Sequence, residues 1–196
     1  MTKCIQEGNL VFEFPTPDVL KYDQSNFYRK HFINECSKDN AAVDFLYCRN
    51  KISWLVEVKD YRYYPRENPS DLAEDVARKV RDTLAGVAAA RLAVTDTATQ
   101  AMAERFLKGN HYRVVLHLEQ TKHPSKLNPM LYKPADLLDK LKRLVRAVDV
   151  HPKVVDMTNC GKHCPWLVRE RQILTTPNIN RTGSAGKATG TVRQKP

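Results

Sequence analysis

The stretch 43–62 constrains the fold of this chain more strongly than any other part of it. Two runs rich in β-branched and aromatic side chains, 43–48 and 52–58, are separated by a short polar break. Two such runs joined by so short a break are typical of a β-hairpin. If the turn is centred on Asn50 and Lys51, the pairing of the two strands is fixed residue by residue.

This pairing brings three ionisable side chains together on one face of the sheet. Asp44 lies opposite Glu57, and Lys59 shares the face of Glu57 because side chains alternate along a strand. Opposed residues have Cβ atoms about 5 Å apart, so the two carboxylates repel by roughly 3 kcal/mol at an effective dielectric of about 20. A divalent cation such as Mg²⁺ would turn this repulsion into attraction. Water on the cation would be a nucleophile near neutral pH, with Lys59 beside it or beside the charge that develops on a phosphate.

The order Asp44, a hairpin, then Glu57-Val58-Lys59 resembles the core motif of the PD-(D/E)xK nuclease superfamily. The resemblance implies an α/β fold with a three-layer, restriction-endonuclease-like core, in which helices flank a mixed central sheet. It spans about 10–118. It also implies that Asp44, Glu57 and Lys59 are catalytic, that Asp44, Glu57 and the Val58 carbonyl bind Mg²⁺, and that Mn²⁺ substitutes for Mg²⁺.

Two features around this motif leave alternatives open. Val43 stands where the superfamily motif has a proline, and a hairpin with solvated charges is the simpler reading, although the apolar strands favour a metal site. Members of the superfamily often place a further acid on the first helix, which we expect from about 23 to 36. Asp23 and Glu35 both fit, and we assign Asp23 as a metal ligand. Its alternative role is to cap the helix or complement the helix dipole.

The predicted function is a Mg²⁺-dependent nuclease that hydrolyses phosphodiester bonds in nucleic acid. DNA is the favoured substrate, and RNA is the alternative. Lys plus Arg number 32 against 22 Asp plus Glu, and the net charge of +10 favours a polyanionic partner such as nucleic acid. One alternative is an inactive nucleic-acid-binding or assembly module with the same fold. Another is an unrelated α/β protein with cross-strand charges. The nuclease interpretation also allows a homodimer, because many nucleases that cut both strands act as pairs.

Three regions supply candidate contacts to nucleic acid. Arg62 and Arg66 alternate with tyrosines in the loop after the hairpin, where arginine can hold phosphates and tyrosine can stack on bases. Lys79 lies on a helix expected over 70–92. A fourth helix, opening at Pro134, carries an outer basic face made of Lys140, Lys142, Arg143 and Arg146. For both helices the alternative is an ordinary solvated face.

The remaining pattern defines the domain organisation. We expect one domain over 1–174 and a flexible basic tail over 175–196, where apolar periodicity stops. Further strands are expected at 9–14, 112–120 and 154–156, and a helix at 95–108. Five cysteines, no secretory leader and no apolar run long enough for a membrane favour a cytoplasmic protein with reduced thiols. Cys160, His163 and Cys164 are too few for a zinc site, which wants four ligands.

Overall fold

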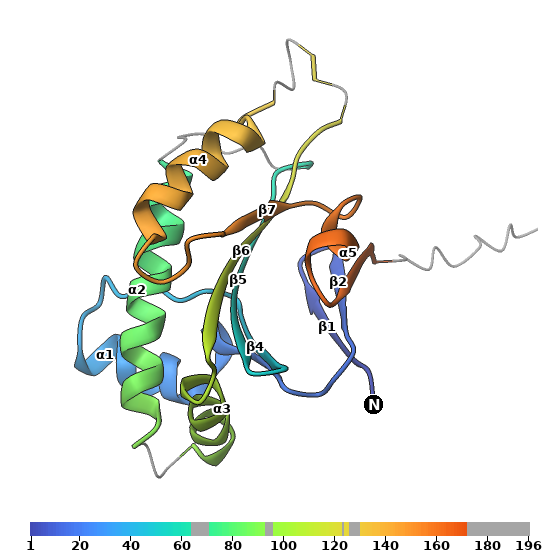
Figure 1. Ribbon diagram of the computed structural model, residues 1–196. Coiled ribbons are helices and arrows are strands. Elements are labelled where there is room, and N and C mark those ends of the chain that lie inside the picture. The colour runs from blue at the N-terminus through green and yellow to red at the C-terminus, as the bar shows by residue number, and fades with distance from the viewer. Residues whose placement is uncertain (64–70, 93–95, 123, 126–129, 172–196) are drawn as a thin grey trace, which may run out of the picture.

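A mixed sheet of five strands forms the middle layer of the structure (Figure 1). The computed structural model describes residues 1–63, 71–92, 96–122, 124–125 and 130–171. In spatial order the strands are β3 (Val19–Lys21), β4 (Phe45–Arg49), β5 (Ile52–Asp60), β6 (His111–Glu119) and β7 (Lys153–Val155). The first three pair antiparallel, and β5, β6 and β7 pair parallel. Parallel strands are buried on both faces, which explains why β5 and β6 read as almost continuous apolar runs.

Helices cover one face of this sheet. They are α2 (Leu72–Ala90), α3 (Thr97–Leu107), α4 (Pro134–Val145) and a first helical region made of a 3₁₀ turn (Tyr22–Gln24), a π-helical segment (Phe27–Phe32) and α1 (Ile33–Glu35). The core below them includes Leu46, Leu55 and Leu116 from the sheet. None of the described helices is both long and apolar enough to cross a lipid bilayer.

A second, three-stranded antiparallel sheet covers the other face. Its order is β1 (Lys3–Glu7), β2 (Leu10–Phe14), β8 (Leu167–Glu170), and the short helix α5 (Cys160–His163) lies beside it (Figure 1). Aromatic side chains fill the space between the two sheets, including Phe14, Tyr47, Trp54 and Trp166. The α/β fold with a three-layer core is therefore confirmed, and a small sheet rather than helices supplies most of the third layer.

The hairpin has the predicted register. Phe45 pairs with Val56 and Tyr47 with Trp54, and one further step along this register sets Asp44 opposite Glu57. Asn50 and Lys51 have φ values of 52° and 59°. Two consecutive residues with positive φ form the turn that matches the twist of a two-residue hairpin.

Several elements differ from expectation. β1 and β8 were not predicted, because both are short and largely exposed and β1 has a single clearly apolar side chain, Ile5. The first helix is wound more widely than an α-helix, which lets Phe27, Tyr28 and Phe32 all face the core. Further along the same segment His31 is partly buried and Cys36 is exposed.

Two boundaries complete the comparison. Asp71 caps α2, where its side chain accepts the Glu74 N–H at 3.2 Å. Ser70, the first residue of the helix expected over 70–92, lies outside the described residues, as does the predicted tail over 175–196. The division into a domain over 1–174 and a tail therefore stays a prediction.

Candidate functional site

Glu57 is the centre of a buried group of charges between β5 and α2. Its side chain is 1% exposed, and Lys59 Nζ lies 2.6 Å from Glu57 Oε1. Lys79, from the middle of α2, reaches the same oxygen at 2.7 Å. The structure thus brings together two side chains predicted from the hairpin and one predicted from the helix. The Glu57 carboxylate is bracketed by two ammonium groups.

Asp44 completes the predicted triad from the opposite strand. Its Oδ2 accepts the Val58 N–H at 2.6 Å. Burial, and then the negative charge of Glu57, raise the pKa of Asp44 to about 7, although Lys79 and the Val58 N–H act to lower it. The buried Asp44 carboxyl is therefore held toward its protonated form more strongly than an ordinary aspartate is.

Asp23 lies near the same group of charges. Burial, and then the charge of Glu7, raise the pKa of Asp23 to about 6, while Lys21 and Lys79 act to lower it. Glu7, at the end of β1, was not predicted as part of the site, and its carboxylate pairs with Lys21 at 2.7 Å. No pattern in the sequence marks Glu7, because its strand is short and mostly exposed.

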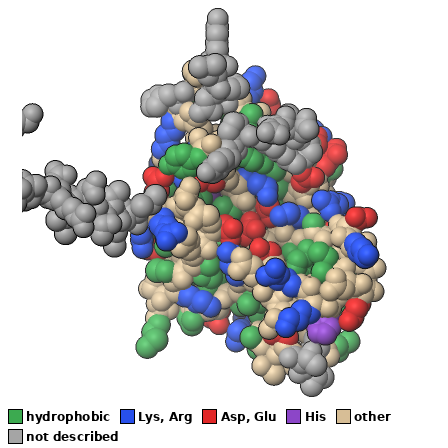
Figure 2. All heavy atoms as spheres, turned by 180° about the vertical axis from the view of Figure 1, so that it is seen from behind, with side chains coloured by type: hydrophobic (Ala, Val, Ile, Leu, Met, Phe, Trp, Pro, Cys, Tyr) green, Lys and Arg blue, Asp and Glu red, His purple; other side chains and the backbone are tan. Residues whose placement is uncertain are grey.

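Lys59 and Lys79 place positive charge beside the carboxylates of the site. Burial would lower the pKa of Lys59, but the charge of Glu57 and its hydrogen bond outweigh burial, so the pKa is raised. Figure 2 shows Asp and Glu side chains gathered near the centre of the rear face, with Lys and Arg side chains next to them.

A hollow of about 420 Å³ opens beside these charges. Its lining is Glu57, Lys59, Tyr61, Asp75, Val76, Arg78 and Lys79. Tyr61, Asp75 and Arg78 were not among the predicted site residues. Because Lys59 and Lys79 are 28% and 22% exposed, a polar ligand can reach the site from solvent.

The carboxylates offer some of the oxygens that a cation needs. Glu57 Oε2 and Asp23 Oδ1 are buried and accept no hydrogen bond within the described part of the chain. Within that same part, no three His, Cys, Asp or Glu side chains are placed to share a metal ion. Mg²⁺ binding by Asp44, Glu57, Val58 and Asp23 therefore stays a prediction.

The predicted contacts to nucleic acid around the hairpin are engaged within the protein. Arg62 Nη2 lies 2.7 Å from Asp60 Oδ2, and Nη1 lies 3.3 Å from Glu170 Oε1. Lys79 contacts Glu57 as described above. Arg66 lies outside the described residues.

A second site, which we call the basic hollow, lies at the C-terminal end of α4. It has a volume of about 470 Å³ and is lined by Lys142, Arg143, Arg146, Val150 and His151. Arg143 and Arg146 are exposed and form no ion pair with any residue that the structure describes. Lys142 lies 3.8 Å from Asp139, outside the lining. The lining within the described ranges is therefore basic without an acidic member.

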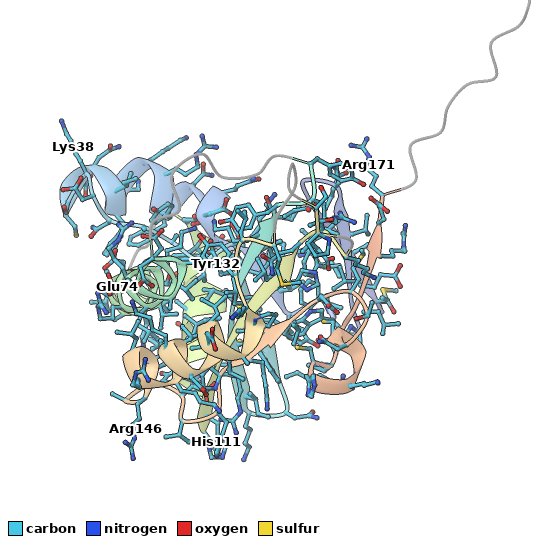
Figure 3. The ribbon with its side chains drawn as sticks, turned by 90° about the horizontal axis from the view of Figure 1, so that it is seen from above. Lys38, Glu74, His111, Tyr132, Arg146 and Arg171 are labelled. Atoms are coloured by element: carbon cyan, nitrogen blue, oxygen red, sulfur yellow. The ribbon has the colours of Figure 1, made fainter. Side chains whose placement is uncertain are left out.

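Hydrogen bonds of Asp149 fix the chain that forms one wall of the basic hollow. Asp149 is 2% exposed and accepts from Arg113 Nη1 at 2.8 Å and from the Val114 N–H at 2.9 Å. It also accepts the His151 N–H at 2.9 Å. Lys140, the other predicted basic residue of α4, instead pairs with Asp71 and Glu74. Figure 3 shows Arg146 on the same side of the molecule as His111 and opposite Lys38.

Comparisons with known proteins bear on both sites. No family model matches the chain, and no solved structure matches it. A cysteine–tRNA ligase from Neisseria meningitidis serogroup A / serotype 4A (strain DSM 15465 / Z2491) is 31% identical over 170 residues. The match covers 70% of this chain and 24% of the ligase. The chain thus spans about a quarter of the length of the curated relative it matches.

This match corrects the predicted function. The similar protein is a tRNA ligase, so the prediction of a metal-dependent nuclease, a hydrolase acting on DNA, is wrong. The structure gives a physical reason for the error. Opposed acids with a neighbouring lysine were read as a site for hydrolysis, yet Glu57 is neutralised by two lysines. The resemblance to the PD-(D/E)xK superfamily stays a prediction, because neither family models nor solved structures match the chain.

Proposed function

We propose that this chain is an RNA-binding module that acts with a tRNA ligase, and that tRNA is its partner. Its 31% sequence identity to the cysteine–tRNA ligase of Neisseria meningitidis supports a role in a reaction of the ligase class. Because the chain spans about a quarter of that ligase, we assign it a binding step within ligation and not the whole reaction. We place the protein in the cytoplasm, where thiols such as its five free cysteines stay reduced.

The basic hollow is the observation that carries this proposal. Arginine forks bind phosphate oxygens through paired N–H groups, and contacts to phosphates supply most of the affinity of nonspecific nucleic-acid binding. Arg143 and Arg146 have no acidic partner among the described residues to compete with a phosphate. The hydrogen bonds of Asp149 hold the neighbouring turn, so His151 and the α4 residues form a fixed surface.

We further propose that Mg²⁺ binds at Asp44 and Glu57, as the superfamily resemblance implies. Carboxylate oxygens are the ligands that Mg²⁺ prefers, and the buried Glu57 Oε2 supports this assignment. The ion would bind Glu57 through Oε2, because both lysines pair with Oε1. The side chains of the site position one another: Asp44 holds the β5 backbone at Val58, and Lys59 and Lys79 fix the orientation of Glu57.

Binding of tRNA at several salt concentrations tests the RNA-binding proposal. If Lys142, Arg143 and Arg146 each neutralise one phosphate, a plot of log affinity against log salt has a slope of about −2 to −3. The Arg143→Ala/Arg146→Ala double variant should lose about two thirds of this slope. Its affinity should fall roughly 10- to 60-fold near 0.1 M salt. Fluorescence anisotropy of labelled tRNA with the full chain measures both quantities.

Two controls make this experiment specific. Arg29→Ala/Lys30→Ala removes the same charge from an exposed helical segment, and it should leave the affinity within about twofold because those residues are outside the basic hollow. A DNA duplex of similar length should bind more weakly than tRNA. Equal effects of the two double variants, or equal affinity for DNA and tRNA, would contradict the proposal.

A further inference from the structure

Two thiols lie beneath a single turn of surface helix. Cys160 begins α5 and Cys164 follows it, with the Cys164 N–H donating to the Cys160 carbonyl at 2.8 Å. Cys160 is fully buried and Cys164 is 7% exposed, whereas Gly161, Lys162 and His163 between them are exposed. The two sulfurs are therefore one helical turn apart and are covered by only one turn of chain.

A buried histidine lies against this pair. His117 projects from β6 into the space between the two sheets, and its Nε2 lies 2.9 Å from Glu119 Oε1. Glu119 also accepts the Met157 N–H at 2.7 Å, and the Phe12 ring packs edge-on against the imidazole at 5.1 Å. Nδ1 of His117 is buried and has no hydrogen-bond partner within the described ranges, and His117 and Cys160 act on each other's pKa.

These contacts make the two thiols unequal. The hydrogen bond with Cys164 and the contact with His117 lower the pKa of Cys160 to about 6, although burial acts to raise it. The pKa of Cys164 is raised by its hydrogen bond to Cys160 and by burial. Burial would lower the pKa of His117, but its interactions with Cys160 and Glu119 outweigh burial and raise it. These surroundings therefore favour ionisation of Cys160 over ionisation of Cys164.

We propose that Cys160 and Cys164 form a reversible oxidation site, which a small hydroperoxide closes to a disulfide and a thiol reductant reopens, with His117 as a positioning residue. The oxidant has to be small, because Cys160 is fully buried and Cys164 is only 7% exposed. A helical rise of about 6 Å over four residues is within the Cα separation that a disulfide spans. Cytosolic disulfides are commonly transient and redox-sensing.

The chemistry needs two steps. The Cys160 thiolate attacks one peroxide oxygen, the O–O bond breaks, and the leaving hydroxide takes up a proton to become water, giving a sulfenic acid. The Cys164 sulfur then attacks the Cys160 sulfur, the S–O bond breaks, and the hydroxyl leaves as water with the Cys164 proton. The two sulfurs together lose two electrons, and the peroxide gains them. His117 acts on Cys160 to favour its thiolate form.

Charged side chains on the neighbouring strands and after β7 act on this site. The pH dependence of Cys160 oxidation therefore depends on all of them together. They are Asp60 on β5, Glu119 on β6, Lys153 on β7 and Asp156 after β7, with Arg62 held against Asp60. With Cys160 largely ionised, its oxidation rate should change less than about twofold between pH 7 and 9. An ordinary thiol with a pKa of about 8.5 would speed up about 25-fold over this range.

Peptide mapping of the full chain after treatment with hydrogen peroxide tests the proposal. We expect a Cys160–Cys164 peptide lighter by two hydrogens, restored by dithiothreitol, and a rate that is nearly constant from pH 7 to 9. Exposed Cys4 and Cys36 serve as references within the same molecule. The emission of Trp166 should change in parallel, because its carbonyl oxygen lies 3.8 Å from Cys160 Sγ.

Variants separate the roles of the three side chains. Cys164→Ser should stop oxidation at the sulfenic acid, which dimedone traps on Cys160. His117→Gln should make the Cys160 rate rise more steeply with pH than in the wild type, because one of the groups that lower the Cys160 pKa is removed. Glu119→Gln, which can still accept the Met157 N–H, should shift the profile part of the way if His117→Gln does not fold. Absence of the Cys160–Cys164 peptide, a wild-type rate that rises with pH as Cys4 does, or one bound zinc per chain by metal analysis would overturn the proposal.

Discussion

Asp44 carries a charge that the fold disfavours, and we expect Asp44→Asn to stabilise the protein at neutral and alkaline pH. The pKa of Asp44 is about 7 in the folded protein against an ordinary value of 3.8. The unfolded chain therefore ionises this carboxyl about three pH units earlier than the folded protein does. At 1.36 kcal/mol per unit, about 4 kcal/mol of stability is present below pH 4 and is lost as the pH rises through 7.

Asparagine at position 44 cannot ionise, so the variant does not lose this stability as the pH rises. Its side chain has nearly the same shape as that of aspartate. Its amide oxygen can accept the Val58 N–H as Asp44 Oδ2 does at 2.6 Å. Urea unfolding of both proteins at a series of pH values measures the difference in free energy. We expect about 0.5 kcal/mol at pH 4, a rise of about 1.4 kcal/mol per pH unit, and a plateau of about 4 kcal/mol above pH 8 in favour of the variant.

Asp39→Asn provides the matched control, because Asp39 is exposed and exposed substitutions usually change stability by less than about 0.5 kcal/mol. A difference between wild type and Asp44→Asn that does not vary with pH would refute the reasoning. So would an Asn variant that is less stable than wild type at pH 8. Either result would mean that Lys79 favours the carboxylate more than burial penalises it.

Two other predictions follow from the contacts around α2 and the acidic site. Gly86→Ala would set a Cβ 2.3 Å from the Tyr22 hydroxyl, and we expect a loss of about 1–3 kcal/mol in urea unfolding. Adding Tyr22→Phe should restore most of it, since that hydroxyl has no hydrogen-bond partner among the described residues; no recovery would contradict the stated cause. Calorimetric titration with Mn²⁺ should show one site that Glu57→Gln weakens at least tenfold, and an unchanged affinity would remove Glu57 as a ligand.

The sequence predicted the parts of the structure that depend on local pattern. The hairpin was predictable because two adjacent β runs and a two-residue break fix the register, and Asp44, Glu57 and Lys59 follow from it. Lys79 was predicted on α2 as a contact to nucleic acid, and its pairing with Glu57 was not predicted. The helical pattern predicts which face of α2 carries Lys79, but it does not predict which strand that face packs against.

The other site residues depend on contacts between distant parts of the chain. Glu7 lies on a short, exposed strand, and His117 looks like any histidine on a half-polar strand until α5 packs against it. The π-helical segment was likewise not predictable, because the same apolar residues fit an α-helix almost as well. The function was mistaken for a related reason: opposed charges do not reveal which partner neutralises them.

The pairing of β2 with β8 has a consequence for how the protein folds during synthesis. Leu10 pairs with Glu170, so one edge of the small sheet cannot form until nearly all of the described chain has been made. At synthesis rates of about 5–20 residues per second, β2 waits for many seconds with its edge open and the aromatic side chains behind it uncovered. An open edge is a template for pairing with other chains. Nascent chains that stall before β8 should therefore be the form most in need of a chaperone.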